Sequence, residues 1–146
     1  IYPSGNLSRE EQKELSNKIK ELTGGLGPNV IYDPVGGSYA EPCLRSIAWE
    51  GRYLVIGFAA GADQIPKMPL NLTLLKGCQI VGVFWGAWAG MFPGENKKNF
   101  EELFSLFSDG KIDPTPSDRF TLEDSANAIE HLKVRKAKGK VIVSIN

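Results

Sequence analysis

The stretch VIYDPVGG, residues 30–37, begins as an apolar run and ends in Asp-Pro and a pair of glycines. The apolar part is typical of a buried strand. Pro34 cannot donate a hydrogen bond to a sheet and Gly37 carries no side chain, so the chain leaves the sheet here and other atoms can approach its backbone closely. Strand ends of this kind often face a ligand. Alternatively, Asp33 only fixes an ordinary turn through its side chain.

Further apolar runs follow the same plan and alternate with amphipathic segments. Their apolar character is continuous, as in parallel strands that are covered on both faces. The alternation predicts an α/β protein with a mostly parallel, doubly wound sheet. The predicted strands are 29–33, 52–57, 78–86 and 138–145, and the predicted helical segments are 9–22, 39–47 and 70–77, followed by two longer helices.

Capping residues predict where the helices begin. Ser8 and Glu11 form a capping-box pattern before the helix 9–22, which the glycines of TGGLG end. Asn96 is the predicted cap of a helix that Gly110 ends, and Thr121 is the predicted cap of the last helix. Apolar residues at helical spacing support both helices: Phe100, Leu103, Phe104 and Phe107 in the first, and Leu122, Ala126, Ile129 and Leu132 in the second.

A change of direction is predicted at the two prolines Pro114 and Pro116. Beyond them, we expect the last helix and the closing strand to leave the main sheet and to form a piece of another subdomain.

The composition excludes several classes of function. The 17 basic and 17 acidic residues balance, which argues against binding to nucleic acid or to an anionic membrane surface. No apolar run reaches the roughly 18 residues of a membrane span. Cys43, Cys78 and His131 stand apart, so neither a disulfide framework nor a metal site is predicted. We expect a soluble intracellular protein in the cytoplasm or an organelle matrix. The start without Met favours a fragment of a longer protein.

Three predicted strand ends combine small residues with apolar or aromatic ones, at 33–37, 57–61 and 83–86. Ligands of open α/β sheets bind outside the carboxyl ends of the strands, so these ends suggest a planar cofactor. Ordinary turns and core aromatic residues remain the alternative. No G-x-G-x-x-G follows a strand, and no catalytic residue is assigned because His131 has no evident Ser or Cys partner. Lys138 and Lys140 are either phosphate ligands or solvated.

Several segments together resemble the C-terminal part of the zinc-independent quinone oxidoreductases, relatives of zeta-crystallin in the medium-chain dehydrogenase/reductase superfamily. They follow the order of that family and cover nearly the whole chain. The segments are ELTGGLGPNVIYDPVGG (21–37), EGRYLVIGFAAG (50–61), LLKGCQIVGVFWG (74–86), DGKIDP (109–114) and KAKGKVIVSI (136–145).

The resemblance implies that residues 1–116 are the second half of a six-stranded Rossmann nucleotide-binding domain and that residues 117–146 return toward the catalytic domain. The first half, with its glycine-rich turn, and the N-terminal catalytic domain are absent from this sequence. The family reaction is hydride transfer from NADPH to a quinone or another conjugated carbonyl. We therefore expect the chain to be inactive alone.

The resemblance also implies which residues contact the cofactor and how the chain associates. No zinc is expected, and a homodimer is expected through the strand at residues 78–85, because an apolar edge strand without charge or proline favours pairing. The edge at 30–33 would lack a neighbour. The residues expected in the cofactor cleft are Val35, Gly36, Phe58, Ala59, Phe84, Trp85 and Gly86, with Arg135 or Lys138 near the phosphates.

Two alternatives stay open. The chain could be a binding or structural module that has lost catalysis. It could also belong to an enzyme of the same superfamily that reduces the double bond of an enal or an enoyl thioester.

Overall fold

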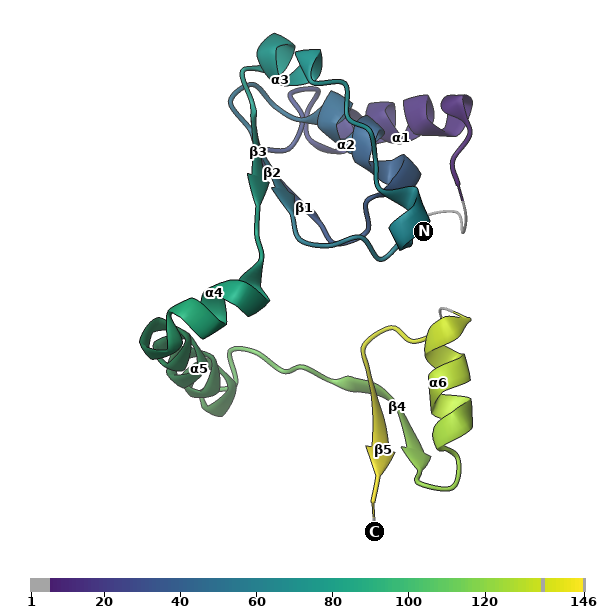
Figure 1. The fold of residues 1–146 in the computed structure, drawn as a ribbon, viewed down its shortest axis with the longest axis vertical. Coiled ribbons are helices and arrows are strands. Elements are labelled where there is room, and N and C mark those ends of the chain that lie inside the picture. Colours follow the sequence, from purple (N-terminus) through teal and green to yellow (C-terminus); the bar gives the residue numbers. More distant parts are fainter. Residues whose placement is uncertain (1–5, 135, 146) are drawn as a thin grey trace. The chain divides into compact units, whose positions relative to one another are not determined.

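A computed structural model describes residues 6–134 and 136–145. These residues form two compact units, and the boundary between the units along the chain lies between Trp88 and Ala89. Figure 1 gives the order of the elements along the chain. In the described residues, no helix has the length and apolar character needed to cross a membrane. The predicted domain boundary after residue 116 refers to the domains of a longer protein and stays a prediction.

The first unit contains a parallel sheet, as the sequence predicts. Its strands have the order β1-β2-β3, and β1 and β3 each pair with β2. Helices connect the strands in chain order, which confirms the α/β class. The elements are α1 (Arg9–Leu22), β1 (Val30–Asp33), the 3-10 turn Gly37–Tyr39, α2 (Ala40–Ser46), β2 (Arg52–Val55), the 3-10 turn Ala62–Gln64, α3 (Asn71–Lys76) and β3 (Gln79–Gly82).

The first helix has the predicted boundaries and the predicted cap. The Ser8 hydroxyl accepts a hydrogen bond from the Glu11 amide at 3.2 Å, and the Glu11 carboxylate accepts one from the Ser8 amide at 2.7 Å. This capping box satisfies two amides that the first turn of a helix leaves unpaired. At the other end, the Gly25 amide donates to the Lys20 carbonyl at 2.7 Å, which closes the helix.

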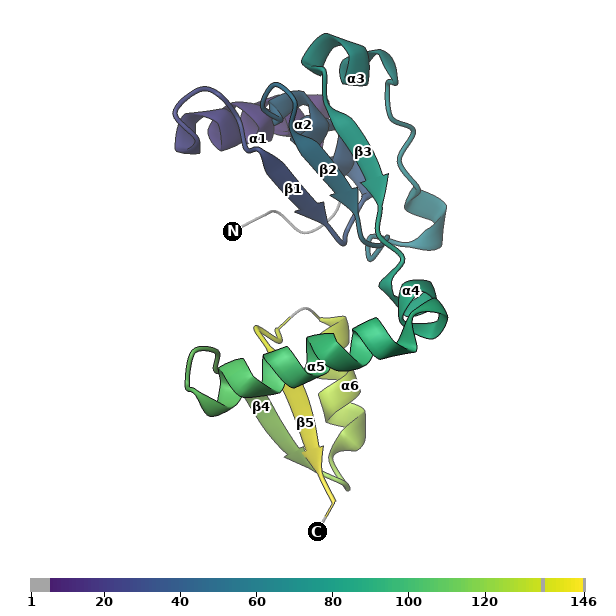
Figure 2. The ribbon, with the colours of Figure 1, turned by 90° about the vertical axis from the view of Figure 1, so that its left-hand side faces the viewer.

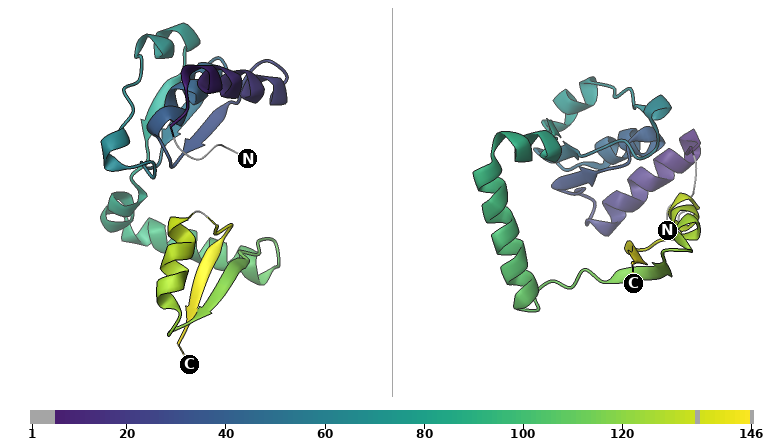
Figure 3. Two further views of the ribbon diagram at one scale, coloured as in Figure 1. Left: turned by 90° about the vertical axis from the view of Figure 1, so that its right-hand side faces the viewer. Right: turned by 60° about the horizontal axis from the view of Figure 1, so that its bottom comes forward.

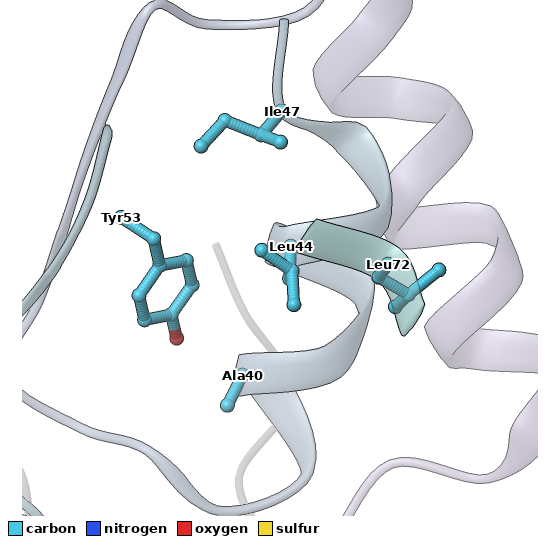
Figure 4. Close-up of a cluster of buried hydrophobic side chains, with 5 residues drawn as sticks. All are labelled: Ala40, Leu44, Ile47, Tyr53 and Leu72. Carbon is cyan, nitrogen blue, oxygen red and sulfur yellow. The ribbon is translucent and has the colours of Figure 1, made fainter. Parts of the chain in front are cut away.

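The core of the first unit lies between the sheet and α2. Its buried side chains come from α2 and the residue that follows it, from β2 and from α3, and Figure 4 shows how they gather. Ile31 and Val55 of the sheet pack against this cluster. The helices α1 and α2 cover the same face of the sheet, as the opposite views in Figures 2 and 3 show. The cluster consists of Ala40, Leu44, Ile47, Tyr53 and Leu72.

The second unit contains another parallel strand pair. The strands β4 (Pro116–Thr121) and β5 (Lys140–Ser144) form their own two-stranded sheet, and α6 (Ser125–Lys133) packs against both. The closing strand thus pairs outside the main sheet, as expected. The long helix α5 (Pro93–Ser108) also belongs to this unit.

Two predicted helix starts are wrong. Asn96 lies inside α5, which begins at Pro93, because proline suits the first helical position, where no hydrogen-bond donor is needed. Thr121 ends β4 and does not cap α6, whose N-cap is Asp124. Pro116 suggested a turn but stands at the first residue of a strand, where its missing amide is tolerated.

The third predicted strand is too long. β3 ends at Gly82, and a short helix, α4 (Trp85–Met91), begins where the strand was predicted to continue. The segment from Trp85 alternates small residues with large apolar ones, so its composition fits either a buried strand or a helix.

His131 contacts a strand of the second unit. It lies in the last turn of α6, as expected for a residue at a helix C-terminus, with its Nε2 atom 3.0 Å from Oδ2 of Asp118 on β4. Its ring lies 5.7 Å from that of Phe120. A hydrogen bond from Ser117, together with the nearby His131 and Lys138 side chains, lowers the pKa of the Asp118 carboxyl. This contact ties α6 to β4.

Truncation of the core leucine should destabilise the first unit. Leu44 has no exposed surface, so Leu44→Ala leaves a cavity and should lower the free energy of unfolding by about 2–5 kcal/mol. Leu74→Ala is the matched control, because Leu74 is 81% exposed on α3 and its loss should cost less than about 0.5 kcal/mol. Denaturant unfolding followed by circular dichroism measures both. Equal losses would contradict the assigned core.

Acid should weaken the second unit through Asp118. Because the folded-state pKa of this carboxyl is lowered, its contribution to stability is present above the unfolded-state pKa and is lost as the pH falls through the folded-state pKa. The protection of the β4 and β5 amides against hydrogen exchange, measured relative to the intrinsic exchange rate at each pH, should therefore fall at acid pH more in the wild type than in Asp118→Asn. Asp109→Asn, which removes an exposed ion pair with Lys111, is the control and should keep the wild-type acid response.

Candidate functional site

The carboxyl ends of the three strands of the first unit lie side by side. Asp33 of β1 is in register with Val55 of β2, and Val55 is in register with Gly82 of β3. Since the strands are parallel, the segments that follow them leave the sheet at the same edge. The structure therefore brings together the three strand ends that the sequence singled out.

The Asp33 carboxylate organises the first of these ends. Its Oδ1 atom accepts hydrogen bonds from the Val35 and Gly36 amides, each at 2.9 Å, which confirms the predicted side-chain turn. Its Oδ2 atom accepts a hydrogen bond from the Tyr53 hydroxyl. Both oxygens are thus engaged by the protein itself, and Asp33 serves to hold the turn.

The ionisable groups next to Asp33 are kept neutral. Burial, reinforced by the hydrogen bond to Asp33 and its charge, raises the pKa of Tyr53. Burial and the same carboxylate raise the pKa of the Cys43 thiol to about 11. A thiol with this pKa is a poor nucleophile at neutral pH, and the structure assigns Cys43 to packing against the core.

The first and second strand ends pack directly on each other. The Ala59 amide donates to the Pro34 carbonyl and the Ala60 amide to the Val35 carbonyl, both at 3.0 Å. Gly36 is buried, with a φ of 68°, and a Cβ atom there would lie 2.9 Å from Cδ1 of Phe58. The glycine is therefore required by the contact between the two loops and by its backbone conformation, whether or not a ligand approaches.

An apolar groove of about 580 Å³, the strand-end groove, lies between the ends of β2 and β3. Phe58 and Phe84 line it, and their side chains are 42% and 79% exposed. The other lining residues are small or aliphatic, and none is charged: Val55, Ile56, Gly57, Gly82 and Val83. Such a groove suits a flat, uncharged ring that packs against aromatic side chains.

The structure gathers some of the predicted cofactor residues and separates others. Phe58 and Phe84 share the strand-end groove, while Trp85 and Gly86 belong to α4 and do not line it. Lys138 lies in the second unit, close enough to Asp118 to affect its pKa. Arg135 lies outside the described residues. The cofactor contacts of all these residues, and of the adjoining Val35, Gly36 and Ala59, stay predictions.

Two aliphatic residues of the strand-end groove, Val55 and Ile56, were not predicted as site residues. Val55 is the last residue of β2 and Ile56 follows it directly, so both border the groove, whereas Val83 belongs to the strand end 83–86 that the sequence singled out. The available signal was Gly57, which follows Ile56 directly and marks the end of the second predicted strand.

The titratable residues form no evident metal centre. Within residues 6–134 and 136–145, no three His, Cys, Asp or Glu side chains lie close enough together to hold a metal ion. The expected absence of zinc stays a prediction.

Comparison with known proteins places the chain in a family. Residues 8–143 match the family described as zinc-binding dehydrogenase. A quinone oxidoreductase-like protein 2 homolog of Nematostella vectensis is 37% identical over 134 residues, which are 91% of this chain and 36% of that protein. The chain thus spans little more than a third of the length of this relative.

Solved structures share the fold. A mycobacterial protein in complex with NADPH superimposes with a TM-score of 0.76 at 23% identity, over 99% of this chain and 42% of that one. The JamJ enoyl reductase superimposes with a TM-score of 0.74 at 23% identity, over 92% of this chain and 39% of that one. The chain belongs to the zinc-binding dehydrogenase family, and its predicted resemblance to the quinone oxidoreductases of the medium-chain dehydrogenase/reductase superfamily is confirmed.

Proposed function

We propose that this chain is part of an NADPH-dependent quinone oxidoreductase-like enzyme and that the strand-end groove receives the nicotinamide ring. The observation that carries the proposal is the uncharged groove with two aromatic walls, Phe58 and Phe84, at the carboxyl edge of a parallel sheet. That edge is where open α/β sheets bind their ligands. Membership of the family supports the same assignment.

The residues of the groove would orient the ring and keep water from it. Bound NADPH supplies a hydride, which together with a proton reduces a quinone or another conjugated carbonyl. The chain contributes apolar contacts and a rigid edge, because the Asp33 turn and the Ala59 and Ala60 hydrogen bonds fix the loops behind Phe58. The described residues of the groove offer no acid or base.

The test restores the sequence that precedes this chain in its gene and measures NADPH oxidation with a quinone. Phe84→Ala should lower kcat/KM about tenfold, because a loss near 1.4 kcal/mol is expected when a large part of one aromatic contact is removed. Trp49→Ala is the control, since Trp49 is exposed and follows α2 at the opposite edge of the sheet.

The outcomes separate the alternatives. Turnover with a quinone, impaired only by Phe84→Ala, supports the proposal and excludes a purely structural module. Turnover with an enal or enoyl thioester but not with a quinone assigns the groove to a double-bond reductase. No oxidation of NADPH or NADH with any of these acceptors would contradict an enzymatic role.

The edge of β3 favours a homodimer, as the resemblance implies. In the described residues β3 pairs only with β2, and the segment 78–85 carries no charge and no proline. The outer side of β3, Gln79–Gly82, thus has no strand partner among the described residues, which favours pairing with a second copy across a two-fold axis. The opposite edge, β1, also lacks a second partner among the described strands.

A charge on each edge distinguishes the two pairing modes. Val81→Lys on β3 should convert a dimer into a monomer in light scattering. Tyr32→Lys is the matched variant on β1, where Tyr32 is 66% exposed while its neighbour Ile31 packs against the core. It should leave the dimer intact and reduce aggregation. A wild-type chain that stays monomeric at high concentration would contradict pairing through β3.

A further inference from the structure

A second cavity of about 830 Å³, the three-helix groove, lies between α1, α2 and α3. It shares no lining residue with the strand-end groove. Pro42 and Leu72, which are buried, form apolar parts of its wall, and Ser16 of α1 is also nearly buried beside them. The three helices meet at this groove within one compact unit, so its shape is set by the packing of the fold.

The three-helix groove concentrates positive charge in a chain whose total charge is zero. Five of its lining side chains are cationic, and Glu41 is the one carboxylate among them. The acidic residues of α1 do not line the groove, because they lie on other sides of that helix: Glu10, Glu11, Glu14 and Glu21. The cationic residues are Arg9, Lys13, Lys20, Arg45 and Lys76.

Most of this charge is uncompensated. Arg45 forms an ion pair with Glu41, whereas Arg9, Lys13, Lys20 and Lys76 form no ion pair with any described residue. Like charges that share a groove repel one another, and a bound anion would relieve this repulsion. The unfavourable arrangement therefore points to an anionic ligand.

Part of the site is held in place before any ligand binds. The Nε and Nη2 atoms of Arg45 donate to Oε1 of Glu41 at 2.8 and 2.6 Å, which fixes the direction of the guanidinium. Leu44 and Leu72 anchor α2 and α3 in the same core. A preorganised cation loses less conformational entropy on binding than a free side chain does.

We propose that the three-helix groove binds a small anion with several phosphate groups. Arg9 and Lys20 are eleven residues apart on α1, or about 16 Å along the helix, so one ligand with a single charge could not contact the whole row. The groove is concave, unlike a surface for a flat membrane. No aromatic side chain lines it, so recognition falls on the phosphates and not on a stacked base.

The test titrates the 146-residue chain with inorganic tripolyphosphate by calorimetry near 0.1 M salt, where exposed charges are screened beyond about 10 Å. We expect saturable binding of one ligand per chain. The double substitution Lys13→Gln/Lys20→Gln should weaken binding about tenfold, and Lys13→Arg/Lys20→Arg should retain most of it. Glutamine is a good helix former, so α1 should persist, which circular dichroism checks.

The control removes the same charge elsewhere. Lys18→Gln/Lys67→Gln changes two exposed lysines outside the groove and should leave the affinity unchanged. Equal weakening by both double variants, or binding without saturation, would overturn the proposal, because it would show only general attraction to positive charge. Tighter binding of a glutamate peptide or of single-stranded DNA than of tripolyphosphate would overturn it as well.

A comparison of ATP with tripolyphosphate identifies the source of the phosphates. Equal affinities support recognition of phosphate alone, as the absence of an aromatic lining residue predicts. Clearly tighter binding of ATP would assign the ligand to the nucleotides, with the phosphates still held by the same cations. Neither result concerns the strand-end groove, so the proposed oxidoreductase function is tested independently by the NADPH oxidation assay.

Discussion

The Asp33 carboxylate connects the parts of the first unit on which the candidate site depends. One oxygen holds the turn after β1, and the other accepts a hydrogen bond from Tyr53, whose ring is buried in the core. A partly buried carboxylate is costly unless its oxygens are paired, so this geometry fixes both neighbours. The same turn places Gly36 against Phe58, which forms one wall of the strand-end groove. Core packing and the shape of the groove are thus linked through one side chain.

Much of the first unit could be predicted from the sequence because its signals are local. The capping box of Ser8 and Glu11 determines the start of α1 without help from the rest of the chain. Continuous apolar runs bounded by glycine and proline identify β1 and β2, and the parallel topology follows from their alternation with helices. The strand ends then fall at one edge by geometry, which is why Phe58 and Phe84 were found together.

The other features of the fold and of the two grooves depend on contacts between residues far apart in the chain, which a single sequence does not display. β4 was missed because its alternating pattern begins at a proline and exists as a strand only through pairing with β5. A need for glycine at position 36 that does not depend on a ligand could not be predicted, because it comes from contact with Phe58, 22 residues away. The three-helix groove was invisible for the same reason, since a balanced total charge conceals cations that three separate helices bring together.

The two grooves differ in charge and therefore in the kind of ligand that each can bind. The strand-end groove is lined by uncharged residues, so it can select the shape of a ring but cannot favour the additional phosphate that distinguishes NADPH from NADH. That preference requires a cation or other donor near the ribose, and no residue of this groove supplies one. The cations of the first unit that gather in a cavity lie instead between the three helices. In the proposed enzyme, the strand-end groove would position the nicotinamide, and residues outside this groove would select between NADPH and NADH.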